Sequence, residues 1–98
     1  MIIANWKSNT IDINRWYTNF NNFYESMSDS AMIGVAPPTI YLDKLVTNLD
    51  KVDVEIKLGV QDVDHSYGSR TGAISVDMII EIGCKFAIIG HSERREIF

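Results

Sequence analysis

The chain has 98 residues and a formal charge of −4, with 46% hydrophobic and 22% charged residues. This composition is typical of a small soluble globular unit. Lysine and arginine form no basic stripe and the longest apolar runs are far shorter than the roughly 20 residues of a membrane helix, so we expect no nucleic-acid partner, no membrane partner and a cytoplasmic location.

The first half of the chain alternates apolar runs with helical patterns. Residues 1–6 predict a buried strand that ends in a polar segment. Large apolar residues recur at helical spacing over 13–27, which predicts an amphipathic helix with a core-facing stripe. A second strand is predicted over 32–36, where two prolines end it because proline cannot donate to a strand ladder. A helical pattern resumes over 39–49, with a proline suited to its first turn.

The second half continues the alternation. Residues 54–60 predict a third strand, and 61–71 form a long polar stretch without periodicity, which predicts a loop. Ser75 can cap a third helix that runs through 82, with Gly83 as its stop. Residues 86–89 predict a fourth strand. The predicted order is strand, helix, strand, helix, strand, helix, strand.

This order predicts the α/β class, with parallel strands and right-handed crossovers. The pattern alone leaves open whether the sheet is doubly wound or part of a (β/α)8 barrel. The absence of a Gly-x-Gly-x-x-Gly turn after the first strand weakens the dinucleotide-binding alternative. The single cysteine, Cys84, cannot form an internal disulfide, and its apolar neighbours predict a buried thiol.

In parallel α/β folds ligands bind at the carboxyl ends of the strands. The residues at or just after the ends of the predicted strands are Asn5, Lys7, Pro37, Gln61, His91 and Glu93. Lys7 can stabilise an anion, His91 can transfer a proton and Glu93 can hold a lysine in place. The residues alone fit structural roles equally well, namely a solvated loop cation, a surface histidine and a carboxylate at a helix start.

Two motifs carry a family resemblance. Residues 4–9, Ala-Asn-Trp-Lys-Ser-Asn, resemble the signature after the first strand of triosephosphate isomerases, and residues 88–95, Ile-Ile-Gly-His-Ser-Glu-Arg-Arg, resemble that family's fourth-strand motif. Segments in the same order between them also resemble the family, at 35–39, 59–62 and 71–75. The resemblance covers residues 1–98 and implies a partial (β/α)8 TIM barrel, a single (βα)3β half-barrel unit.

The resemblance also implies a reaction, the interconversion of dihydroxyacetone phosphate and glyceraldehyde 3-phosphate in glycolysis and gluconeogenesis, without a cofactor or metal. It implies that His91 polarises the carbonyl and shuttles a proton, and this family is itself the usual example of a neutral histidine at a helix N-terminus. Lys7 offsets the charge of the transition state, and Asn5 orients the site. Glu93 positions the Lys7 ammonium group, and residues 92–94 open a helix.

The loops that build the family's dimer show both agreement and departure. We expect Gln61, Thr71 and Arg94 to support loops or the interface, and Thr71 matches a residue that reaches the neighbouring subunit's site. Four positions depart from the family: Ser8 replaces a usual Met, Asp62 an Asn, Arg70 an aromatic residue and Ala73 a Glu. That Glu pairs with the arginine matching Arg94, so the partner of Arg94 and the usual dimer stay open.

A complete barrel has about 250 residues. The family's catalytic Glu, closing lid and phosphate-binding loops fall outside the 98 residues, so the isolated chain is expected to be inactive. Open strand edges and one uncovered strand face predict a homo-oligomer, with the uncovered side chains drawn from Ile2, Ile3, Ile33, Val35, Ile56, Leu58, Ile88 and Ile89. Two alternatives stay open: a self-associating half-barrel structural module, and a binding domain for small anionic ligands around Lys7 and His91.

Overall fold

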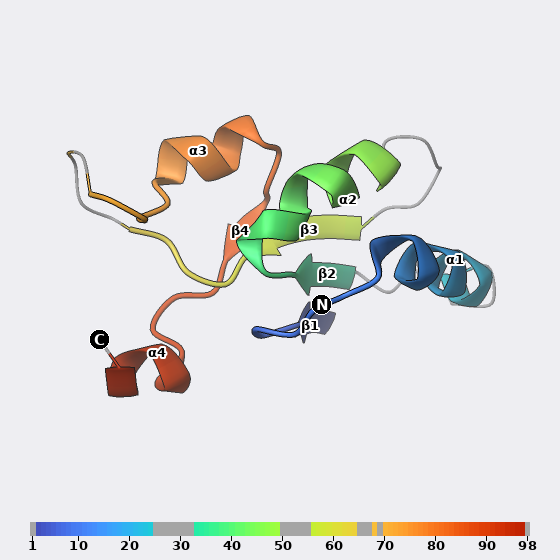
Figure 1. Ribbon diagram of the computed structural model, residues 1–98, viewed down its shortest axis with the longest axis horizontal. Helices are drawn as coiled ribbons and strands as arrows, with labels where there is room; N and C mark the ends of the chain where they lie inside the picture. The colour runs from blue at the N-terminus through green and yellow to red at the C-terminus, as the bar shows by residue number, and fades with distance from the viewer. Residues whose placement is uncertain (1, 25–32, 50–55, 65–67, 69, 98) are drawn as a thin grey trace.

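The computed structural model describes residues 2–24, 33–49, 56–64, 68 and 70–97. In this part of the chain, four parallel strands form one sheet in the order β1 (Ile2–Asn5), β2 (Ile33–Ala36), β3 (Ile56–Val60) and β4 (Phe86–Ala87) (Figure 1). The helices are α1 (Ile13–Tyr24), the short 3-10 helix η1 (Thr39–Tyr41), α2 (Leu42–Leu49), α3 (Val76–Glu81) and α4 (Ser92–Ile97). The predicted α/β order with parallel strands is confirmed, and it is consistent with part of a TIM barrel.

One face of the sheet forms the core with the helices. Successive residues of a strand point to opposite faces, and Val35 lies beside Leu58 in the register of β2 and β3. Ile33, Val35 and Leu58 are buried together with Leu45 of α2, which lies against β3. Of the set from which the uncovered side chains were expected to come, Ile33, Val35 and Leu58 are therefore excluded, because the helices cover the face on which they lie.

The opposite face of the sheet is partly covered by one aromatic ring. Phe86 of β4 lies across Gly34 and Gly59, where a Cβ atom would come within 2.9 Å and 2.4 Å of ring atoms, respectively. Two neighbouring strands therefore lack side chains where the ring packs. Ile3, on the same face of β1, remains 45% exposed, so the ring covers only part of this face.

The predicted ends of the elements are mostly confirmed. Ser75 caps α3, since its Oγ accepts a hydrogen bond from the Met78 backbone N–H at 3.3 Å. Gly83, which follows α3, has a φ of 97°, a conformation that favours glycine at a helix end. Strand β4 is shorter than the predicted 86–89. The N–H of Ile88 still donates to the Val60 carbonyl at 2.9 Å, and Val60 is the last residue of β3.

The second predicted helix begins as a 3-10 turn. Pro38 precedes η1, and its carbonyl accepts from the Tyr41 N–H at 3.0 Å before α2 continues the chain. The predicted helix 13–27 appears as α1, and its positions 25–27 lie outside the described residues. The predicted first residues of the second and third strands, Met32 and Val54, also lie outside them.

Two expectations from composition can be compared with the structure. Cys84 is buried, at 8% exposure, and this burial raises the pKa of its thiol, so the predicted buried cysteine is confirmed. None of the helices in the described ranges combines enough length and apolar character to cross a membrane.

The packing of Phe86 on glycine predicts a coupled pair of substitutions. Gly59→Ala should lower the free energy of unfolding by about 1–3 kcal/mol, the usual cost of overpacking, because the new methyl group overlaps the Phe86 ring. Urea denaturation followed by circular dichroism measures this cost. In the Phe86→Ala background the same glycine substitution should cost much less. An equal cost in both backgrounds would show that the ring is not the obstacle.

Candidate active site

The candidate residues gather where the strands end. Asn5 is the last residue of β1, Lys7 lies in the turn after it, and Gln61 directly follows β3. His91 precedes α4, and Glu93 is the second residue of that helix. These five residues line one cavity of about 970 Å³ together with Thr71 of the loop after β3. Parallel strands place their carboxyl ends at one edge of a sheet, which is why residues far apart in sequence meet here.

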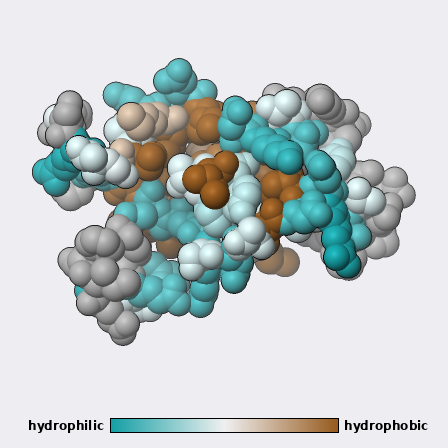
Figure 2. Space-filling model, in the orientation of Figure 1, coloured by the Kyte–Doolittle hydropathy of each residue, from teal (hydrophilic) through white to brown (hydrophobic). Residues whose placement is uncertain are grey.

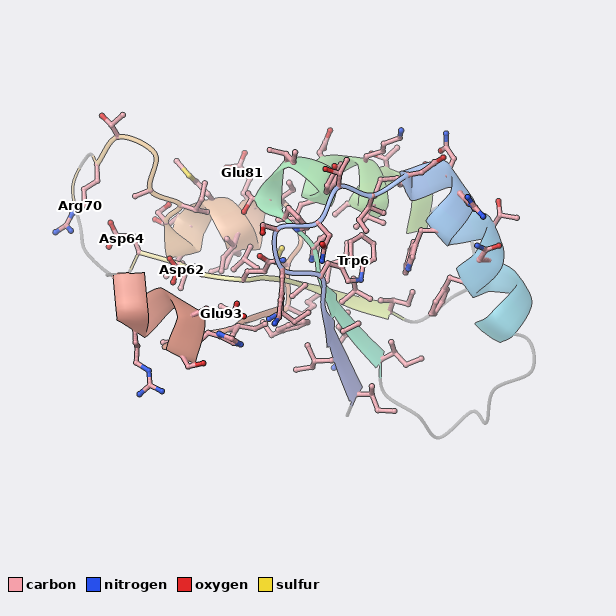
Figure 3. The ribbon with its side chains drawn as sticks, turned by 60° about the horizontal axis from the view of Figure 1, so that its bottom comes forward. Trp6, Asp62, Asp64, Arg70, Glu81 and Glu93 are labelled. Atoms are coloured by element: carbon pink, nitrogen blue, oxygen red, sulfur yellow. The ribbon has the colours of Figure 1, made fainter. Side chains whose placement is uncertain are left out.

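An ion pair links the first and last of these segments. Lys7 Nζ donates to Glu93 Oε1 at 2.9 Å, with both side chains about half exposed. In Figure 3, Glu93 extends from α4 toward the turn after β1. The hydrogen bond from Lys7 lowers the pKa of Glu93, the positive charges of Lys7 and of a protonated His91 act the same way, and loss of hydration opposes them. Glu93 therefore stays ionised beside the ammonium group at neutral pH.

His91 is oriented by the start of α4. Its Nδ1 accepts a hydrogen bond from the Glu93 backbone N–H at 3.2 Å, and Glu93 Oε2 lies 3.8 Å from the same nitrogen. The His91 carbonyl accepts from the Arg95 N–H at 3.0 Å. A ring nitrogen that accepts a hydrogen bond carries no proton, so the neutral ring has its hydrogen on Nε2. The imidazole can therefore present a donor to a substrate oxygen.

The backbone of Lys7 has an unusual conformation. Its φ of 53° is the only positive value among the described non-glycine residues, and such a conformation costs about 1–3 kcal/mol for most residues. Two side chains restrain it. Asn5 Oδ1 accepts from the Lys7 N–H at 2.9 Å, and Gln61 Nε2 donates to the Lys7 carbonyl at 2.8 Å.

Sequence reasoning gave no role to Trp6, which lies within the Asn-Trp-Lys motif. Its ring meets Trp16 of α1 edge-on at 5.0 Å, and Trp16 stacks on Phe20 at 5.1 Å. Asn9 Nδ2 also donates to the Trp6 carbonyl at 2.8 Å. The turn that carries Lys7 is thus anchored to α1. The signal for this contact in the sequence is the apolar stripe of α1 together with the tryptophan of the motif.

The loop after β3 forms the outer wall of the cavity. The Asp64 N–H donates to the Ile74 carbonyl at 2.8 Å, and Arg70 Nε lies 3.5 Å from Asp64 Oδ2. Figure 3 shows Arg70 and Asp64 at the far end of this loop, away from Glu93. Thr71 is exposed in the same loop, whereas the side chain of Arg94 lies outside the described part of the structure.

The arrangement can stabilise negative charge and donate a proton at neighbouring points. Lys7 supplies a cation and His91 a ring donor, and Glu93 contacts both. Within the described ranges, no group of three or more His, Cys, Asp or Glu side chains is placed to hold a metal ion.

Comparison with known proteins identifies the family. The family model for triosephosphate isomerase matches residues 1–98. Among curated relatives, the triosephosphate isomerase of Baumannia cicadellinicola is 39% identical over 98 residues, covering 97% of this chain and 38% of the relative. The triosephosphate isomerases of Buchnera aphidicola and Blochmanniella pennsylvanica are 39% and 41% identical, and each match covers 37% of the relative.

The chain spans about two fifths of the length of the curated relatives it matches. The alternatives of a structural module and an anionic-ligand binding domain are not favoured by these matches. The match over the whole chain agrees with the resemblance of its first-strand and fourth-strand motifs and with its four parallel strands. The chain belongs to the triosephosphate isomerase family.

Proposed function

We propose that this chain, a single unit over residues 1–98, supplies the electrophile half of a triosephosphate isomerase site. The reaction is the interconversion of dihydroxyacetone phosphate and glyceraldehyde 3-phosphate, a step of glycolysis and gluconeogenesis in the cytoplasm. The observation that carries the proposal is the ion pair of Lys7 with Glu93 at 2.9 Å beside a histidine whose Nδ1 is already occupied.

Lys7, His91 and Glu93 have different roles in the proposed reaction. The Lys7 ammonium group offsets the negative charge that develops on the substrate oxygen as an enediolate forms, and such preorganised charges act mainly on the transition state. His91 donates from Nε2 to the carbonyl oxygen and moves a proton between the two substrate oxygens. Glu93 holds the ammonium group of Lys7 and presents its own N–H to His91.

The remaining candidates support these three. Asn5 orients the turn through the Lys7 N–H, while Gln61, Thr71 and Arg94 support the loops around the cavity. Removing a proton from the substrate carbon requires a base within hydrogen-bond reach. Glu93 is engaged by Lys7, and the family's catalytic Glu does not match any residue of this chain. The base and the phosphate-binding loops are therefore proposed to come from the part of the relatives that this chain does not span.

The first prediction concerns the 98 residues alone. The purified chain should show no isomerase turnover above the solution reaction, because a site without a base cannot abstract the carbon-bound proton. A coupled assay with dehydrogenase and nicotinamide cofactor measures the rate. Activity that follows the protein through purification and disappears in Lys7→Met would contradict this prediction, since it would reveal a substitute base within the chain.

A second prediction tests the assigned roles. When the chain is mixed with the matching C-terminal part of a relative, recovered activity should fall about 10²–10³-fold in Lys7→Met, as for other charge-stabilising groups. His91→Asn should lose about 10²–10⁴-fold, the usual contribution of a positioned proton donor. Thr47→Ala, which removes only a hydrogen bond to Asp43 within α2, is the control and should retain activity. An unchanged rate in His91→Asn would refute its role.

We further propose that the isolated chain forms a homo-oligomer. Strands β1 and β4 lie at the two edges of the described sheet, and unpaired edges favour association. Ile2 and Ile3 of β1 are 65% and 45% exposed, and Ile89 after β4 is 79% exposed. Figure 2 shows further apolar surface over α3, where Met78 is 54% exposed. Leaving a few hundred Å2 of such surface wet forfeits several kcal/mol at about 25 cal/mol per Å2.

Dilution tests this association. Sedimentation velocity should show an oligomer at high protein concentration, and the helical circular dichroism signal should fall as the oligomer dissociates, because the separated chain is marginally stable. Ile3→Lys, which places a charge on the exposed face of β1, should shift the midpoint of dissociation to higher concentration. A monomer whose folding is cooperative and independent of concentration would rule out this proposal.

A further inference from the structure

One side-chain amide joins the ends of three neighbouring strands. Gln61, directly after β3, donates from Nε2 to the Lys7 carbonyl at 2.8 Å and to the Ala36 carbonyl at 2.9 Å. Ala36 is the last residue of β2, and Lys7 lies two residues beyond the end of β1. A glutamine NH2 group has two hydrogens. Both are used here, each on a backbone carbonyl of a different segment.

The backbone conformation of Lys7, in the turn that Gln61 contacts, is not stable without support from other residues. A φ of 53° is intrinsically unfavourable for lysine. Such a conformation persists only when surrounding contacts fix it. Asn5 holds the peptide on the N-terminal side of Lys7, and Gln61 holds the peptide on its C-terminal side. With both peptides fixed, the Cα–Cβ direction of Lys7 is also fixed.

The position of the Lys7 ammonium group depends on the Cα–Cβ direction of the residue, because the side chain is largely exposed. The Lys7 side chain is 56% exposed, and its ammonium group forms an ion pair with Glu93, whose side chain is 55% exposed. An exposed pair of this kind contributes little on its own, since ordering two long side chains costs about as much as the pair gains. The backbone of Lys7 must therefore bring Nζ close to Glu93 before the pair forms.

We infer that Gln61 is a positioning residue for Lys7, whose two amide hydrogens keep the Lys7 backbone left-handed and aim its ammonium group at Glu93. The role is that of a support, since the amide reaches backbone carbonyls and not the reacting atoms. The consequence for catalysis rests on the proposed function. The positioning itself does not, because it can be measured without substrate or activity.

The test is a titration of Glu93 in the 98-residue chain. Glutamate labelled with ¹³C at the carboxyl carbon reports the Glu93 pKa by NMR. In the unaltered chain this pKa lies below its ordinary value of about 4.3, because Lys7 donates to the carboxylate. Lys7→Met should return it toward that value. Gln61→Met, which has a similar length but no donor, should also raise the Glu93 pKa, although Lys7 is still present.

Tyr41→Phe is the matched control. The Tyr41 hydroxyl accepts from the Ile11 N–H at 3.2 Å, so this variant also loses one side-chain contact to a neighbouring loop but touches neither Lys7 nor Glu93. Its Glu93 pKa should stay low. A folded Gln61→Met chain that keeps the low Glu93 pKa would overturn the proposal, and so would an equal rise in Tyr41→Phe, which would indicate a general loosening.

If Gln61→Met does not fold, the proposal can be tested in chains that carry Lys7→Gly. Glycine adopts the left-handed conformation without steric cost, so Lys7→Gly removes the need for the restraint. The double variant Lys7→Gly/Gln61→Met should then regain the circular dichroism signal of Lys7→Gly alone. If the double variant also fails to fold, Gln61 acts through something other than the Lys7 backbone, and the inference is wrong. Neither result depends on whether the assembled enzyme is active.

Discussion

The site depends on the common direction of the strands. Because all four described strands run parallel, their carboxyl ends meet at one edge, and Lys7 and Glu93 make contact although they lie 86 positions apart. The turn after β1 then supplies a cation, and the turn after β4 supplies a ring donor. Each of these side chains lies at the end of a different strand. They therefore come together only when the sheet has formed. Assembly of the site therefore requires formation of the sheet.

Much of the fold could be predicted from local signals. The two prolines after β2, the serine cap of α3 and Gly83 each act within a few residues, and they mark the ends of elements correctly. Which strand residues point to which face of the sheet is harder to predict. Nearly continuous apolar strands hide the two-residue alternation between the faces. The sequence therefore leaves Ile33 and Leu58 among the candidates for the uncovered face, whereas both lie in the buried core.

The candidate site shows a similar division. Its residues follow from strand ends and motifs, and the structure places Asn5, Lys7, Gln61, His91 and Glu93 around one cavity. The support of Lys7 could not be read from the sequence. A left-handed lysine has no signature of its own, and the two carbonyls that Gln61 reaches belong to β2 and to the turn after β1. Backbone acceptors are the same for every residue type, so sequence alone does not indicate which of them a side chain will find.

The aromatic contacts at the start of the chain have a consequence for observing it. Trp6 and Trp16 are the two tryptophans of the sequence, and their ring centres lie 5.0 Å apart at an interplanar angle of 65°. Indole transitions at this separation and angle couple electronically. Trp6 is the residue next to Lys7, so a displacement of the turn that carries the cation would change the geometry of this indole pair and with it the optical activity and emission of the pair.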